Sequence, residues 1–139
     1  MKTIAVCASG PSLTLEDCAT VRKCCDETVA VNDTWRMGRF DHLYAADAHW
    51  WHHHIHDINM GFGGKRWSCD PPKNTNWNKH DPDDWGITVL DADTGGEGLS
   101  RDAGTVITGG NSGYQAINLA YHLGATRIIL LGFDMCWSN

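Results

Sequence analysis

The stretch TIAVCASGPS, residues 3–12, decides the fold that this sequence predicts. Its first six residues are mostly apolar, which is typical of a buried strand, and the Gly-Pro pair ends that strand. Thr14 and Asp17 follow at the spacing of a capping box, which predicts a helix over residues 15–24. A strand that passes at once into a helix is the opening unit of an α/β fold with a parallel sheet.

The rest of the chain repeats this alternation of strand and helix. Further strands are expected over residues 28–31, 42–46 and 127–131, and further helices over residues 48–59 and from about 112 to 123. Residues 65–104 hold one short apolar run, 87–90, and predict loops with one or two strands. The prediction is a single α/β domain, residues 1–139, with a Rossmann-like, open and mainly parallel sheet. We also expect an irregular middle insertion at about 60–104, and we expect no covering helix after the last strand.

The composition of the chain argues against two classes of binding partner, nucleic acids and membranes. The formal net charge of −6 argues against nucleic acid, because non-specific binding to its phosphates needs a basic surface. No stretch reaches the roughly 18 apolar residues of a membrane span, and the first strand begins without a signal peptide before it. The six cysteines form no C-x-x-C pair, which favours free thiols over disulfides. We therefore expect a cytoplasmic protein with neither a membrane nor a nucleic acid as partner.

Small or polar residues follow the ends of four expected strands. They are Ser9-Gly10-Pro11-Ser12, Asn32-Asp33, Asp47 and Gly132-Phe133-Asp134. In an open parallel sheet these ends share one edge, where ligands bind in a crevice. The loop at 9–12 leads into one helix and Asn111-Ser112-Gly113 begins another, and a helix N-terminus favours an anion. The pattern predicts a small phosphorylated ligand; the alternative is that these residues only cap helices and form turns.

The same motifs, taken in order, resemble one related set of proteins. The motifs are Gly10-Pro11-Ser12-Leu13, Val31-Asn32-Asp33, Gly110-Asn111-Ser112-Gly113 and Gly132-Phe133-Asp134. The set comprises the bacterial CMP-sialic-acid-dependent sialyltransferases and the archaeal 6-hydroxymethylpterin diphosphokinase-like proteins, and the chain is most similar to small phage proteins with this pattern. The resemblance covers roughly residues 3–47 and 105–135 and implies a nucleotide in the crevice. The ligand contacts expected from these motifs are Ser9, Gly10, Pro11, Ser12, Asn32, Asn111, Ser112, Gly113 and Gly132.

Two departures separate this chain from the sialyltransferases. They carry Asn where this chain has Ser9, and they continue past the last strand into a segment with a catalytic His and Tyr. This chain has Cys136 where that tyrosine would stand, so the transferase chemistry does not carry over. The catalytic candidates are instead Asp47, His49 and Asp134, which lie at expected strand ends and carry groups able to transfer a proton.

Five histidines lie in the segment HWWHHHIH, residues 49–56. On a helix His49, His52, His53 and His56 share one face, and imidazoles at positions i and i+4 can hold a divalent ion such as Zn²⁺. Five histidines within eight residues produce such pairs by chance, so the pattern does not by itself predict a metal site. The alternative is neutral histidines at the surface or beside the ligand.

Five cations in expected loops could each reach a phosphate or simply be solvated. They are Arg36, Arg39, Lys65, Arg66 and Arg101. No other feature of the sequence distinguishes these two roles.

Three functions remain open at this level. The chain is a nucleotide-dependent transferase-like enzyme, a binder that sequesters a nucleotide or nucleotide signal without turning it over, or an assembly protein with a vestigial pocket. A parallel sheet usually has a helix after its last strand, and an uncovered face would expose an apolar patch. We therefore expect a homo-oligomer in which a second copy covers that face.

Overall fold

The computed structural model describes residues 1–70, 77 and 81–135, and its centre is one sheet of seven parallel strands. The order across the sheet is β6-β5-β4-β3-β2-β1-β7. The strands are β1 (Thr3–Cys7), β2 (Glu27–Val31), β3 (His42–Tyr44), β4 (Lys65–Asp70), β5 (Ile87–Asp93), β6 (Thr105–Ile107) and β7 (Arg127–Leu131). The chain builds the sheet outward from β1 to β6 and then returns to place β7 on the free side of β1. This confirms the predicted α/β class with an open parallel sheet.

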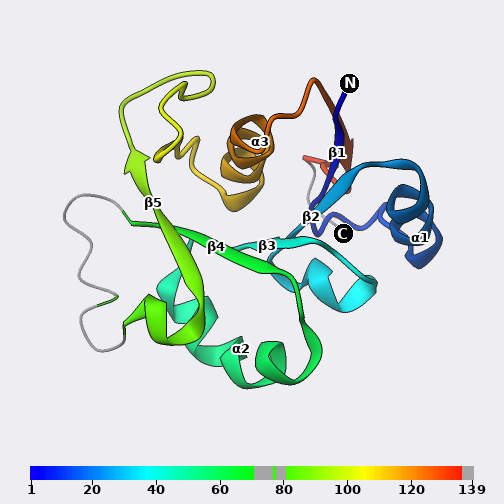
Figure 1. The fold of residues 1–139 in the computed structure, drawn as a ribbon, viewed down its shortest axis with the longest axis horizontal. Coiled ribbons are helices and arrows are strands. Elements are labelled where there is room, and N and C mark those ends of the chain that lie inside the picture. The colour runs from blue at the N-terminus through cyan, green and yellow to red at the C-terminus, as the bar shows by residue number, and fades with distance from the viewer. Residues whose placement is uncertain (71–76, 78–80, 136–139) are drawn as a thin grey trace.

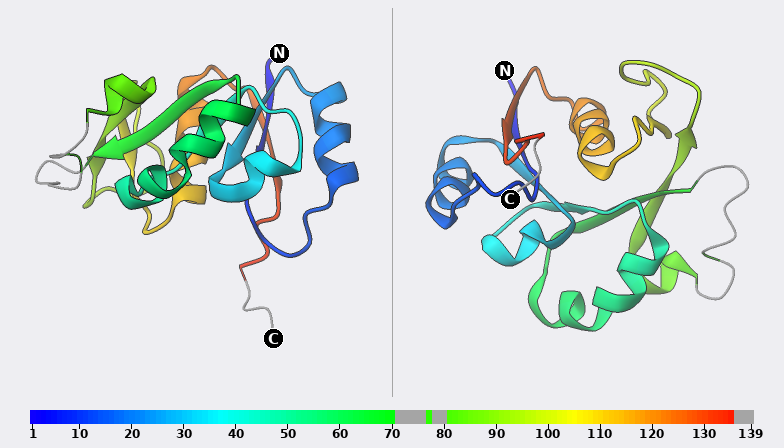
Figure 2. Two further views of the ribbon diagram at one scale, coloured as in Figure 1. Left: turned by 90° about the horizontal axis from the view of Figure 1, so that it is seen from below. Right: turned by 180° about the vertical axis from the view of Figure 1, so that it is seen from behind.

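Helices cover both faces of the curled sheet (Figures 1 and 2). The helices are α1 (Leu15–Cys24), α2 (Ala48–Gly61) and α3 (Ser112–His122), with short 3₁₀ turns η1 (Asn32–Met37) and η2 (Pro82–Trp85). α1 and α2 lie on the outer face, and α3 lies in the hollow of the curl, where it connects β6 at one edge to β7 at the other (Figure 1). α1 begins with the predicted capping box, in which Thr14 and Asp17 bond each other's backbone N–H groups.

The two faces of β1 contribute to two separate apolar clusters. Ala5 and Cys7 pack toward the α1 and α2 side, whereas Ile4 and Val6 pack toward α3, and all four are fully buried. A strand with both faces covered needs a continuous apolar run, because alternate residues enter different cores. The run at residues 4–7 is therefore the sequence signature of a central strand.

The middle of the chain belongs to the sheet. β4 and β5 lie within residues 60–104 and pair with each other and with β3 and β6. The expected one or two strands are therefore present, and the irregular parts are the connections between them. Among the described residues no helix follows β7, and β7 is an edge strand whose Leu130 side chain is 46% exposed. Nor does any helix in this part of the chain have the length and apolarity needed to cross a bilayer.

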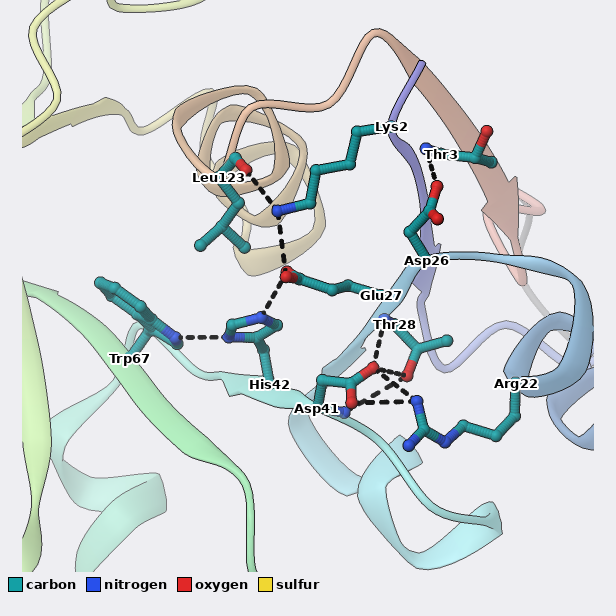
Figure 3. A network of polar contacts seen from close by, with 10 residues as sticks. All are labelled: Lys2, Thr3, Arg22, Asp26, Glu27, Thr28, Asp41, His42, Trp67 and Leu123. Carbon is teal, nitrogen blue, oxygen red and sulfur yellow. Dashed lines mark hydrogen bonds and ion pairs between the residues drawn. The ribbon is translucent and has the colours of Figure 1, made fainter.

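A polar network fixes the amino ends of β1, β2 and β3 (Figure 3). Glu27 lies between the Lys2 ammonium, at 3.0 Å, and Nε2 of the buried His42, at 2.9 Å. Trp67 Nε1 donates to His42 Nδ1 at 3.0 Å, so His42 carries its proton on Nε2 and donates it to Glu27. Partial burial opposes ionisation of Glu27, but the hydrogen bonds from Lys2 and His42 outweigh it and lower the pKa of the Glu27 carboxyl.

Substitution Glu27→Gln should destabilise the fold in a pH-dependent manner. Because the pKa of Glu27 is lower in the folded chain than in the unfolded chain, its charge stabilises the fold above the unfolded pKa. That contribution disappears as the pH falls through the folded pKa. We expect a loss of about 1–3 kcal/mol in unfolding free energy at pH 7, measured by urea denaturation, that shrinks below about pH 5. Glu97→Gln, at an exposed loop position, is the control, and a loss independent of pH would contradict the assignment.

Candidate functional site

A cleft of about 220 Å³ opens at the carboxyl edge of the sheet, between the ends of β1, β2 and β7 and the start of α3. Eight of the nine ligand contacts expected from sequence line it. These are Ser9, Gly10, Pro11, Asn32, Asn111, Ser112, Gly113 and Gly132. The chain leaves β1 toward β2 but reaches β7 on the opposite side, which makes this the topological switch point where ligands of open α/β sheets bind.

The loops after β1 and β7 are held together through their backbones. The N–H of Gly10 donates to the carbonyl of Gly132 at 2.9 Å. A Cβ at position 10 would lie 2.2 Å from the Gly132 oxygen, and Gly132 itself has φ of 71° with its Cβ position 2.2 Å from the Ala8 oxygen. Both glycines are required by this contact between the loops. The sequence pattern predicted only that Gly10 contacts a ligand.

Ser12 is the expected ligand contact that does not line the cleft. Its hydroxyl and its backbone N–H both donate to the carboxylate of Asp134, the latter at 2.8 Å. These two hydrogen bonds lower the pKa of Asp134, so its carboxylate is charged at neutral pH. The donors that the first loop was expected to offer a phosphate are therefore occupied by a residue of the last loop.

The start of α3 is the cleft wall that offers free donors. Asn111 caps the helix by accepting from the N–H of Tyr114 at 2.8 Å, and the Ser112 hydroxyl accepts from the N–H of Ala46 at 3.2 Å. In the described part of the chain, the backbone N–H groups of Ser112 and Gly113 have no acceptor. These two groups stand at the positive end of the helix dipole, where an anion is stabilised.

Asn32 closes the cleft on the β2 side in a left-handed conformation. Its φ is 51°, which is uncommon for a residue other than glycine although asparagine tolerates it. Within residues 1–70, 77 and 81–135 its side-chain amide has no hydrogen-bond partner. The Asn32 amide is therefore a polar group at the cleft that remains available to a ligand.

The three catalytic candidates do not lie together in the structure. Asp134 lines the cleft, but Asp47 and His49 do not. Asp47 is the N-cap of α2 and accepts from the N–H of His49 at 2.8 Å, which is a structural role. His49 is exposed on α2.

The histidines of α2 do not converge on a metal site. His54 stacks on Trp50 with ring centroids 4.5 Å apart and approaches Asp33 at 3.6 Å, and His52 packs edge-on against Trp85. Over the described ranges of the chain, no group of three or more His, Cys, Asp or Glu side chains is placed to hold a metal ion. The described cysteines are all free thiols, and Cys136 lies outside the described residues.

The cations singled out from sequence lie away from the cleft. Arg36 pairs with Asp57 at 2.9 Å, and Arg66 bonds Asn59 and the carbonyl of Trp85. Arg39 and Lys65 line a different cavity at the amino edge of the sheet. Among the described residues that line the cleft there is no Lys or Arg, so the donors it offers an anion are backbone N–H groups and polar side chains.

Sequence reasoning did not identify the apolar walls of the cleft, Phe133 and Met135. A Cβ on Gly113 would lie 2.9 Å from the Phe133 ring, so this glycine lets the ring cover the start of α3. A glycine immediately after a helix cap is a sequence signal of such close packing, but it does not name the ring. Comparison with protein-family models, with curated proteins and with solved structures finds no match to this chain.

Substitution Gly10→Ala should destabilise the fold by about 1–3 kcal/mol, because the added Cβ overlaps the Gly132 carbonyl and forces the two loops apart. Urea denaturation measures the loss. Gly63→Ala is the matched control, because a Cβ there meets nothing within 4 Å. Equal stability of the two variants would show that the loops are not held together as described.

Proposed function

We propose that this protein binds a small phosphorylated ligand of the nucleotide class in the cleft, with a phosphate at the start of α3. The observation that carries the proposal is the pair of backbone N–H groups of Ser112 and Gly113, which have no acceptor among the described residues and belong to residues that line the cleft. A helix N-terminus supplies both donors and a favourable dipole for a phosphate. The order of motifs that resembles nucleotide-dependent transferases supports the same ligand class.

The volume of the cleft limits what lies inside it. At about 220 Å³ it is smaller than the roughly 300–1,000 Å³ of sites that enclose a whole drug-sized ligand. It suits one part of a nucleotide, with the remainder lying along the rim. In this proposal the Asn32 amide, which also lines the cleft, bonds that part of the nucleotide, and Phe133 and Met135 offer apolar contact.

Binding without turnover is the favoured form of the proposal. Of the three catalytic candidates only Asp134 lines the cleft, and its carboxylate already accepts two hydrogen bonds from Ser12. The transferase-like alternative needs a second reactive group there. In the proposed setting the protein acts in the cytoplasm, where its thiols stay reduced, and as a homo-oligomer that covers β7. If the molecular mass measured in solution equals that of one chain, the homo-oligomer is no longer part of this proposal.

Substitution Asn32→Gly should weaken nucleotide binding by about 1–3 kcal/mol, because it removes the amide yet keeps a residue that adopts positive φ. Calorimetric titration with a panel of nucleotides measures the affinity, and analysis of the recovered ligand distinguishes a binder from an enzyme. Asn59→Ala, on α2 and outside the cleft lining, is the control. Unchanged affinity in the glycine variant would remove Asn32 from the site, and no binding by the natural sequence would refute the proposal.

Substitution Asp134→Asn tests where the phosphate lies. The amide oxygen of the variant can still accept from the Ser12 N–H, and its NH2 group can donate to the Ser12 hydroxyl, while a negative charge is removed from the cleft wall. A phosphate at the start of α3 should then bind several-fold more tightly, and more so at low ionic strength. Weaker binding would instead mean that the carboxylate itself accepts from the ligand.

A further inference from the structure

A second and larger cavity, of about 650 Å³, lies at the opposite, amino edge of the sheet. It is enclosed by the end of α1, the loop before β3 and the loop before β4, where Arg22, Arg39, Asp41 and Lys65 stand. Its volume falls within the range of sites that hold small molecules. It shares no lining residue with the cleft.

The carboxylates of this cavity are already neutralised. Arg22 Nη1 bonds both oxygens of Asp41 at 2.9 Å, and Asp41 also accepts from the N–H and hydroxyl of Thr28 (Figure 3). Glu27 is paired with the Lys2 ammonium at 3.0 Å. Each carboxylate therefore has a cationic partner of its own.

Arg39 and Lys65 are left without a counter-charge. Both side chains line the cavity and are exposed, and over the described residues neither takes part in an ion pair or side-chain hydrogen bond. The chain as a whole carries a net charge of −6. Two unpaired cations that line one cavity make its surface locally positive on an acidic protein. They do not serve to stabilise the C-terminal end of α1, because Arg22 and Lys23 already lie in the last turn of that helix.

A backbone hydrogen bond joins the two loops that carry these cations. The N–H of Lys65 donates to the Asp41 carbonyl at 2.9 Å, which ties the loop before β4 to the loop before β3. A Cβ on Gly64 would lie 2.4 Å from the same carbonyl oxygen, so the close approach depends on glycine. Phe40 and Phe62, both largely buried, add apolar surface to the lining. The backbone that carries Lys65 is therefore fixed beside the loop that carries Arg39.

We infer that this amino-edge cavity binds a small anion that carries at least two negative groups, one bound by Arg39 and one by Lys65. Phosphate and carboxylate groups both satisfy this chemistry, since arginine and lysine pair with either. The inference does not depend on the proposed function of the cleft, because the two sites lie at opposite edges of the sheet.

Calorimetric titrations with inorganic pyrophosphate and with citrate test the inference and distinguish the two chemistries. We expect saturable binding of at least one probe, and Arg39→Gln and Lys65→Gln should each weaken it by about tenfold or more. Both residues are exposed, so their variants should fold, and their thermal unfolding is measured alongside. Lys23→Gln, which removes an equally exposed charge outside the cavity, should leave the affinity unchanged.

The cleft variant Asn32→Gly separates this site from the proposed nucleotide site, because it should not alter binding at the amino edge. Absence of saturable binding for both probes would overturn the inference. An equal loss of affinity in Lys23→Gln would also overturn it, because binding would then depend only on net charge. A loss of affinity confined to Asn32→Gly would overturn it too, because the probe would then bind in the cleft.

Discussion

The parallel pairing of β7 with β1 is the contact on which the cleft depends. Residues 3–7 pair with 127–131 in register, and this brings the two following loops side by side although more than a hundred residues separate them. Gly10 then bonds Gly132, and Ser12 bonds Asp134. The same return of the chain through α3 aims the start of that helix into the gap. One strand pairing thus assembles three of the walls of the candidate site.

The direction of the helices divides the charges between the two edges of the sheet. Helix N-termini meet the carboxyl edge, where Asp47 caps α2 and Asn111 caps α3. Helix C-termini meet the amino edge, where Arg22 and Lys23 occupy the last turn of α1. This matches the preference of carboxylates and cations for opposite ends of the helix dipole. The same polarity puts backbone donors at the cleft, whereas the two unpaired cations of the amino-edge cavity, Arg39 and Lys65, come from a loop and from β4.

Local patterns in the sequence predicted most of the fold. The helix over 15–24 and the strand over 127–131 were predicted with the bounds that the structure has, because a capping box and a run that is apolar after its first residue are local signals. β4, with the sequence KRWSCD, was not predicted, since charged residues begin and end it and its burial comes only from neighbouring strands. β6 has three residues, too few for any periodicity.

The candidate site was predictable as a set of residues but not as a set of contacts. Polar residues after strand ends gather at one edge in any parallel sheet, so Gly10, Asn32 and Ser112 were expected together, and they line one cleft. The bond between Ser12 and Asp134 could not be predicted, because it depends on which loops the topology places side by side. It changes the chemistry of the site, because both Ser12 donors are occupied by Asp134 and are not available to a ligand.

The cleft and the amino-edge cavity therefore differ in both volume and charge. The cleft has oriented donors, a strained asparagine and little volume, so it favours a ligand group recognised by hydrogen bonds and shape. The amino-edge cavity has three times the volume and two unpaired cations but no helix N-terminus, so it favours a ligand recognised by charge. Because the two sites lie at opposite edges of the sheet and share no lining residue, one substitution at either edge should leave recognition at the other intact.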